Sequence, residues 1–134
     1  MTLPVTGLAT AICALMLIYT AYATVKVRLA NKIGFGDGDN LDLLTARRIH
    51  ANLAEHAPLF LIMLGVLELA DAWHWGITAV AGIFLIGRAA HIYGMNKHYK
   101  GGSPIFRQIG VVATWITIVT LALWIIYLFV TVNL

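Results

Sequence analysis

Charged residues are scarce in this chain of 134 residues, and their scarcity excludes an ordinary soluble domain. Asp, Glu, Lys and Arg make up only 11% of the sequence, whereas hydrophobic residues make up 60%. A water-soluble protein of this size cannot bury so much apolar surface, because small domains keep a large share of their surface exposed. We therefore expect a single domain over residues 1–134, with lipid as its main solvent.

Cysteine is nearly absent as well. Cys13 is the only cysteine, and it lies in an apolar run. One cysteine excludes a framework of disulfide bonds within the chain. The His, Cys and carboxylate residues show none of the spacings of protein metal sites, so no metal ion is expected. The formal charge of +3 is small, and no nucleic-acid partner is expected.

The Gly/Asp-rich segment GFGDGDN lacks the residues that would make it a ligand-binding loop. In an EF-hand calcium loop, the sixth position needs Gly and the twelfth needs Glu, but Asp42 and Arg48 stand there. A phosphate-binding loop would end in Gly-Lys-Ser/Thr, which is missing here. The segment is predicted to be a turn at the start of a helix. The candidate N-cap residues are Asp39, Asn40 and Asp42.

Long uncharged runs are what the sequence has in abundance. Residues 4–25 and 109–132 contain no charged residue, and further apolar helices are predicted at about 42–70 and 76–97. Each run is close to the ~20 residues that cross a bilayer. Short connections join them, so we predict an all-α membrane protein, an antiparallel bundle of four transmembrane helices. The AYA segment at residues 21–23 is interpreted as part of a retained helix, because no positive region precedes it.

Basic residues are missing from the second connection, whereas they flank the first and the third. The flanking basic residues are Lys26, Arg28, Lys32, Arg47, Arg48, Lys97, Lys100 and Arg107. The positive-inside rule therefore predicts that the first and third connections lie in the cytoplasm and both termini on the opposite side. The aromatic residues expected at that opposite surface are Trp73, Trp75, Trp124 and Tyr127.

Polar side chains gather where the second span begins, in RRIHANLAEHAPLF at residues 47–60. On a helix of about 100° per residue, Arg48, Asn52 and Glu55 share one face. Glu55 lies roughly 22 Å up its helix from the second connection, and Arg88 lies roughly 18 Å up the next helix. An unpaired charge in mid-membrane costs about 3 kcal/mol. The matched heights therefore predict a direct or ligand-bridged pairing of Glu55 with Arg88.

The third helix continues this polar face. His91, Met95 and Tyr99 follow Arg88 on one side, and Arg107 opens the fourth helix at the same end. The residues predicted to form the rim of one pocket are Arg28, Arg48, Asn52, Glu55, Arg88, His91 and Arg107. Such a rim suits a small anionic ligand, because Arg binds carboxylates in bidentate pairs, while Asn and Glu suit an amide or an ammonium group. The alternative is that these residues only hold helices together and anchor them at the interface.

The same residues carry a family resemblance. RIHANLAEHAPLF resembles the signature of the MAPEG family (membrane-associated proteins in eicosanoid and glutathione metabolism), with its polar positions at Arg48, Asn52 and Glu55 followed by Pro58. GRAAH at residues 87–91 is similar to the third-helix segment of the family, and GFGDGDN resembles its small bacterial branch. The resemblance covers essentially the whole chain. It implies a homotrimer in a bacterial inner membrane, with glutathione bound between neighbouring subunits near the cytoplasmic face.

The resemblance also implies roles for individual residues. The implied glutathione-binding residues are Arg28, Arg48, Asn52, Glu55, Arg88 and His91. Within this set, Arg28 and Arg88 would contact the carboxylates or order the site. Arg107 is implied as the catalytic residue, because an adjacent cation favours the thiolate form of glutathione.

Two hypotheses of different classes follow. The first is a membrane-bound glutathione transferase or peroxidase-like enzyme of detoxification, acting on lipophilic electrophiles or hydroperoxides that enter from the bilayer. The second is a non-catalytic binding or scaffold protein of the same fold, and a small transporter is a more distant third. His56 and Met95 bear on this choice, because they stand where enzymes of the family often carry tyrosine.

Overall fold

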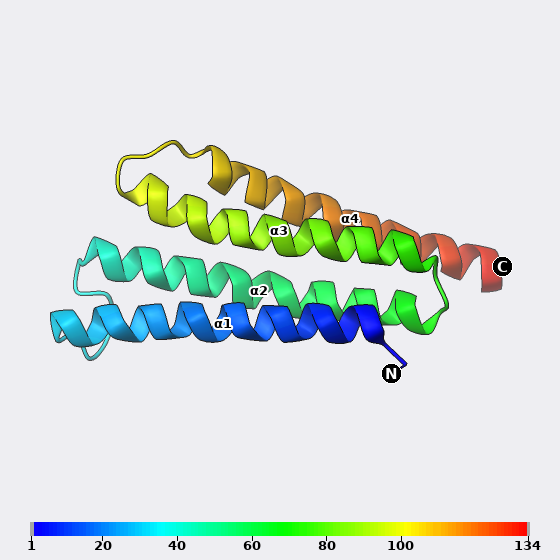
Figure 1. Cartoon of the computed structure of the whole chain (residues 1–134), viewed down its shortest axis with the longest axis horizontal. Coiled ribbons are helices and arrows are strands. Elements are labelled where there is room, and N and C mark those ends of the chain that lie inside the picture. The colour runs from blue at the N-terminus through cyan, green and yellow to red at the C-terminus, as the bar shows by residue number, and fades with distance from the viewer. Residues whose placement is uncertain (1, 134) are drawn as a thin grey trace.

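Four long antiparallel helices make up the protein in a computed structural model that describes residues 2–133 (Figure 1). The helices are α1 (Pro4–Asn31), α2 (Leu41–Leu69), α3 (His74–Tyr99) and α4 (Ile105–Asn133). Each helix is long and apolar enough to cross a membrane. The prediction of an all-α bundle of four transmembrane helices is therefore confirmed.

The helices extend past the uncharged runs at two places. α1 continues beyond Val25 to Asn31, and α4 begins at Ile105 rather than at residue 109. A helix that is already nucleated adds further residues at little cost. Basic side chains at its end keep their charged groups in the aqueous interface. As a result, Arg107 lies inside the first turn of α4, although it precedes the uncharged run.

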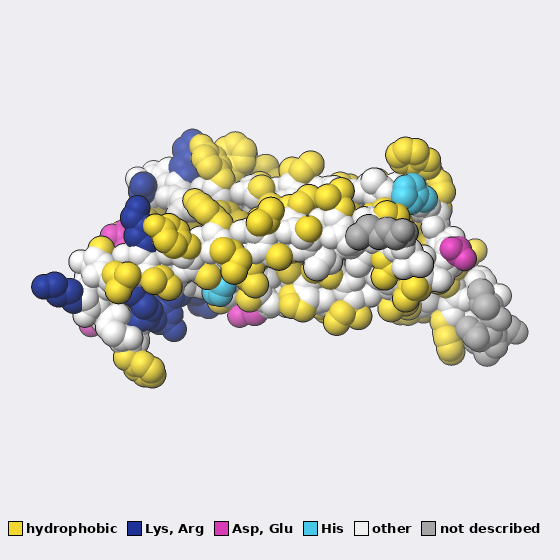
Figure 2. Space-filling model, turned by 60° about the horizontal axis from the view of Figure 1, so that its bottom comes forward, with side chains coloured by type: hydrophobic (Ala, Val, Ile, Leu, Met, Phe, Trp, Pro, Cys, Tyr) yellow, Lys and Arg dark blue, Asp and Glu magenta, His cyan; other side chains and the backbone are white. Residues whose placement is uncertain are grey.

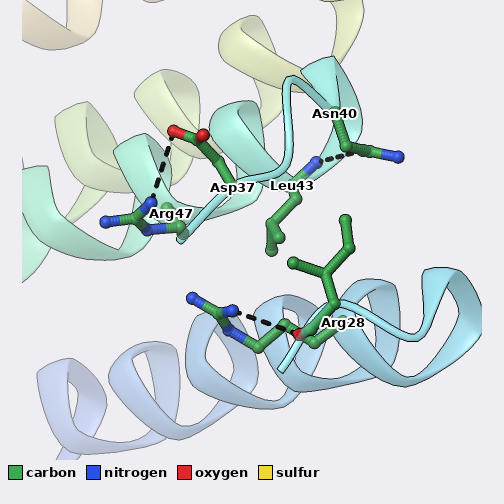
Figure 3. Close-up of polar contacts among 6 residues, drawn as sticks. Arg28, Asp37, Asn40, Leu43 and Arg47 are labelled. Carbon is green, nitrogen blue, oxygen red and sulfur yellow. Dashed lines mark hydrogen bonds and ion pairs between the residues drawn. The ribbon is translucent and has the colours of Figure 1, made fainter. Parts of the chain in front are cut away.

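The connection between α1 and α2 is held by local polar contacts (Figure 3). Asn40 is the N-cap of α2, and its side-chain oxygen accepts a hydrogen bond from the Leu43 amide at 2.9 Å. At the other side of the connection, the Arg28 guanidinium donates to the Ile33 carbonyl at 3.3 Å. Of the three candidate N-cap residues, Asn40 is the one that the structure uses.

The start of α1 is capped from a distance. Leu3, its N-cap residue, offers no side-chain hydrogen bond. Instead, the two carboxylate oxygens of Glu68, near the end of α2, accept hydrogen bonds from the Val5 and Thr6 amides, each at 2.8 Å. These contacts satisfy two of the four free amides of the helix and place a negative charge at its positive end.

The core lies mainly between α2 and α3. The rings of Phe60 and Phe84 stack there with centroids 3.7 Å apart and an interplanar angle of 3°. Leu53, Leu64 and Leu121 are buried in the same cluster. Among the described residues, α2 and α3 contact both outer helices, whereas α1 and α4 do not contact each other. α1 and α4 therefore present broad apolar faces to the surroundings of the chain.

Glycines bring α3 and α4 unusually close together. A Cβ at Gly87 would lie 2.8 Å from the Ala113 Cβ, and one at Gly110 would lie 2.6 Å from the Gly87 carbonyl oxygen. A Cβ at Gly94 would collide with the backbone at Phe106 and Arg107. Small residues on facing helices are a common device for close packing in membranes. Here they press the first turns of α4 against α3.

Charge is distributed unevenly along the bundle. Figure 2 shows Lys and Arg side chains gathered at one end, while hydrophobic side chains cover the middle. That end carries the α1–α2 and α3–α4 connections, and both termini lie at the other (Figure 1). Trp73 and Trp75 are exposed at the end of the bundle where the termini lie, and Trp124 packs on Gly76 there.

Candidate functional site

A polar pocket opens between α2, α3 and α4, toward the basic end of the bundle. Its volume is about 320 Å³. The lining residues are Arg48, Ala51, Asn52, Glu55, His91, Met95, Arg107 and Val111. Five of the seven residues predicted to share a rim are therefore brought together, and Met95 joins them. A volume of this size lies at the lower end of the range found for small-molecule sites.

α2 contributes the longest polar row to the pocket. Arg48, Asn52 and Glu55 line it from one helix face, as their spacing predicts. Arg48 and Glu55 are exposed in the single chain, whereas Asn52 is half-buried. Glu55 lies near the middle of this long helix, so in a membrane its charge needs cover from water or from another protein surface.

α3 and α4 supply the other wall. His91 is 5% exposed and Met95 is half-buried, so both are less exposed than Arg48 and Glu55 of α2. Arg107 is exposed and stands in the first turn of α4, where the unpaired amides of a helix start add partial positive charge. Gly94 positions this turn, because any side chain there would push the backbone of Arg107 away from α3.

Arg88 is the most deeply placed charge of the described chain, with 2% of its surface exposed. Its Nη1 donates to Asn52 Oδ1 at 2.6 Å, and its Nη2 donates to the Gly110 carbonyl at 2.9 Å. Its guanidinium carbon lies 5.9 Å from the centroid of the Phe84 ring. Its Nε is buried and has no hydrogen-bond partner among the described residues.

The predicted direct pairing of Glu55 with Arg88 is wrong. Across residues 2–133, the one ion pair joins Arg47 to Asp37 at 3.5 Å, outside the pocket. Helical rise estimates how far along the bundle a residue lies, but it says nothing about its direction around the helix. Arg88 points into the bundle toward Asn52, one turn from Glu55, while Glu55 faces the open side of the pocket.

Arg28 is also not where the sequence placed it. Its guanidinium binds the Ile33 carbonyl in the α1–α2 connection, as Figure 3 shows, and it does not line the pocket of its own chain. The outer position of α1 explains this, because α2 separates it from α4. Any contact of Arg28 with a ligand in such a pocket would require a second copy of the chain.

The charges around the pocket favour an anion that also carries one cationic group. Arg48 and Arg107 provide two positive charges on its wall, and Glu55 provides one negative charge. Arg88 adds a further positive charge behind Asn52, and no carboxylate of residues 2–133 lies within ion-pair distance of it. Within the described part of the chain, no group of His, Cys, Asp and Glu residues could hold a metal ion.

Sequence reasoning missed the residues that position this site. Gly94 and Gly110 carry no polar chemistry, yet they set the distance between α3 and α4. The spacing of Gly87 and Gly94 by two helical turns was the available signal, because small residues at such intervals mark close helix contacts. Glu68, which caps α1, was missed as well, because no local sequence pattern links it to the start of that helix.

Comparison with known proteins identifies a family and relatives of this chain. The sequence model of the MAPEG family matches residues 6–127. The chain is 28% identical to the inner membrane protein YecN of Escherichia coli strain K12 over 119 residues, which cover 89% of this chain and 88% of that protein. The protein of the same name from Escherichia coli O6:H1 strain CFT073 matches with the same identity and coverage. No solved structure matches the chain.

Proposed function

Because this chain belongs to the MAPEG family, we propose that it is an integral inner-membrane protein that binds glutathione. In this proposal it acts as a glutathione transferase or peroxidase on lipophilic electrophiles or hydroperoxides. The observation that carries the proposal is the set of Arg48, Asn52, Glu55, His91 and Arg107 on one pocket of about 320 Å³. The inner membrane follows from the name of its Escherichia coli relatives.

The residues of the pocket fit the groups of glutathione. The tripeptide has two carboxylates, one ammonium group and two peptide bonds. Arg48 and Arg107 supply guanidinium groups for carboxylate or thiolate, and Glu55 supplies a carboxylate for the ammonium group. Asn52 supplies a neutral amide for a peptide or carboxylate oxygen. The net positive charge of this set matches the net negative charge of the ligand.

Glutathione would supply a thiol nucleophile, and the chain would supply its activation. Arg107 combines a fixed cation with the positive end of α4. A cation beside a thiol favours the thiolate, which is the reactive form. The apolar faces of the bundle leave a second substrate free to approach from the lipid phase. We therefore assign Arg107 the catalytic role and the other pocket residues a binding role.

The proposal includes assembly as a homotrimer whose pocket faces the cytoplasm. Glu55 and Arg48 are exposed in the single chain, so a neighbouring copy would cover them from lipid. Arg28 could then reach a pocket of a neighbouring subunit, although it lies outside the pocket of its own. The cytoplasmic orientation rests on the gathering of basic residues at the pocket end (Figure 2). Lipid molecules are the remaining partners.

A non-catalytic binding protein of the same fold is the second candidate. The observation that favours it is Met95, which lines the pocket where enzymes of the family often carry a tyrosine. A thioether has no donor group, so it cannot replace the hydrogen bond that a tyrosine hydroxyl donates to a thiolate or a substrate oxygen. Under this reading the chain binds glutathione, or a lipid with a similar headgroup charge, without turnover.

Calorimetric binding of glutathione to the purified protein tests the proposal, with Arg48→Ala as the key variant. We expect its affinity to fall by about tenfold or more, because a charge-assisted contact to a carboxylate is lost. Arg47→Ala is the matched control, since Arg47 is the adjacent residue and pairs with Asp37 outside the pocket. Equal affinity in Arg48→Ala and wild type would contradict the proposed site.

A conjugation assay with a generic electrophile separates the two candidates. An enzyme should turn over, and Arg107→Ala should lower kcat more than it weakens binding, because thiolate stabilisation acts on the chemical step. Tight binding without conjugation or peroxide reduction would favour the binding protein. Absence of glutathione binding by wild type would reject the transferase and leave the binding protein with a lipid as its only ligand.

A further inference from the structure

Arg88 does not reach the pocket, although its hydrogen-bond partner Asn52 lines the pocket. It is 2% exposed, and it is not one of the residues that line the pocket. One guanidinium nitrogen is bound to Asn52 on α2 and the other to the Gly110 carbonyl on α4. The same carbonyl also accepts the Thr114 hydroxyl at 2.8 Å. Arg88 therefore joins three helices, with both terminal nitrogens engaged, and its burial keeps the remaining N–H groups away from the pocket.

The chemistry of this contact fixes the orientation of the Asn52 side chain. A guanidinium group has donors only, so the Asn52 atom that it contacts at 2.6 Å must be the oxygen. The amide nitrogen lies on the other branch of the planar group, away from Arg88. Asn52 is half-buried and lines the pocket, and within residues 2–133 its amide nitrogen forms no hydrogen bond.

We propose that Arg88 is a positioning residue, which holds the Asn52 amide so that its NH₂ group faces the pocket as a hydrogen-bond donor. The donor selects an oxygen acceptor on the ligand, a carboxylate or a peptide carbonyl, and rejects a donor such as an ammonium group. Glu55, one turn away on α2, is then the acceptor that takes the cationic group. Along one face of α2, the pocket thus presents a hydrogen-bond donor and an acceptor at different positions. It thereby distinguishes ligand groups that accept hydrogen bonds from ligand groups that donate them.

The close approach of α3 and α4 contributes to this positioning of the Asn52 amide. The Gly110 carbonyl anchors Arg88, and that carbonyl is within reach because Gly87 and Gly110 leave no side chains between the two helices. An anchored guanidinium cannot rotate toward the pocket, and a fixed amide loses little freedom when a ligand binds. The identity of the ligand rests on the proposed function, whereas the orientation of Asn52 does not.

Two substitutions of Asn52 test the orientation without any ligand. Asn52→Asp keeps an oxygen for Arg88 and adds an opposite charge, so we expect a melting temperature in detergent equal to or above that of wild type. Asn52→Leu has a similar volume but offers no acceptor. It should melt lower by about 3 °C or more, because it leaves a guanidinium nitrogen unpaired. Equal melting temperatures of Asn52→Leu and wild type would overturn the inference, whether or not glutathione binds.

Calorimetry with glutathione then tests the donor. Asn52→Asp should bind about tenfold more weakly or worse, although it is as stable as wild type, because its second oxygen repels an acceptor. Asn52→Leu should also bind more weakly, and it controls for charge, since it leaves the charge of the pocket unchanged. Wild-type affinity in either variant would overturn the inference while leaving the glutathione site itself intact.

A double-mutant cycle tests whether Arg88 acts through Asn52. Arg88→Met should weaken glutathione binding in the wild-type background and have no further effect in the Asn52→Leu background. Additive losses would mean that Arg88 contacts the ligand directly or only supports the fold, and would overturn its positioning role. If Arg88→Met does not fold, the Asn52 variants still test the orientation of the Asn52 amide and its role as a donor. If wild type binds no glutathione, the proposed function fails, and the melting temperatures alone decide the orientation.

Discussion

Single residues in this protein act mainly through the helix ends and helix contacts that they satisfy. Glu68 binds two amides of α1, and Asn40 caps α2. Arg88 binds acceptors on two other helices. Lipid cannot satisfy backbone or side-chain hydrogen bonds, so a polar group within a membrane protein must find its partner in the chain or in trapped water.

Loss of the Glu68 carboxylate should destabilise the fold. In Glu68→Gln, one oxygen can still accept a hydrogen bond, but the NH₂ group cannot replace the second, and the negative charge at the start of α1 is gone. We expect unfolding in detergent to become easier by about 1 kcal/mol. Asp71→Asn is the matched control, because it removes a carboxylate at the same end, and Asn tolerates the positive φ of 51° there. Equal loss in both variants would argue against the cap.

The difference between Glu55 and Asn52 shows where sequence reasoning reaches its limit at this scale. Helical spacing correctly grouped Arg48, Asn52 and Glu55 on one face, because that grouping depends only on the geometry of a single helix. The partner of Arg88 depends on how two helices are rotated against each other, which side-chain packing decides. The nearest acceptor in the bundle proved to be a neutral amide rather than the carboxylate at matched height.

At the scale of whole elements, the number and order of the helices were predictable, since uncharged runs of this length have few other uses. Their ends were less predictable. α4 begins before the uncharged run does, because a basic residue near a helix end can remain helical outside the hydrocarbon. The place of α1 at the edge of the bundle, which removes Arg28 from the pocket, also depends on packing that no single helix encodes.

Gly94→Ala should disturb the α3–α4 pair. Its Cβ would collide with the backbone at Arg107, and backbone cannot move aside as a side chain can. We expect a loss of roughly 1–3 kcal/mol in unfolding free energy and weaker glutathione binding, because Arg107 would shift. Gly82→Ala on the same helix is the control. Its Cβ would meet nothing within 4 Å, so stability should stay the same or rise slightly. A neutral effect at both positions would contradict the close contact.

For the whole molecule, the charge distribution predicts how the bundle sits in the membrane. The eight Lys and Arg residues other than Arg88 lie in the first and third connections or within about two helical turns of them. A reporter that works only in the cytoplasm should therefore be silent when fused after residue 134 and active when inserted after residue 36. Strong activity of the C-terminal fusion would reverse the topology and place the pocket on the other side.

The exposed polar face of α2 predicts self-association. Native mass spectrometry in a mild detergent should give a species of three times the chain mass of 14.6 kDa. Burial of charges such as Glu55 near the middle of a helix is the physical reason, because lipid contact costs about 3 kcal/mol for each. Monomers alone across several detergents would leave those charges without cover and contradict the trimer.

The distant cap of α1 has a consequence for how the chain is made. The amides of Val5 and Thr6 receive their partner from a residue that follows them by 63 and 62 positions. When a ribosome has just delivered the first span, that partner does not yet exist, so water must hold these amides at the membrane surface. The start of α1 therefore acquires its final hydrogen bonds only after α2 has crossed the membrane in the opposite direction. The two spans thus mature as one hairpin, with the carboxylate of the later helix closing the end of the earlier one.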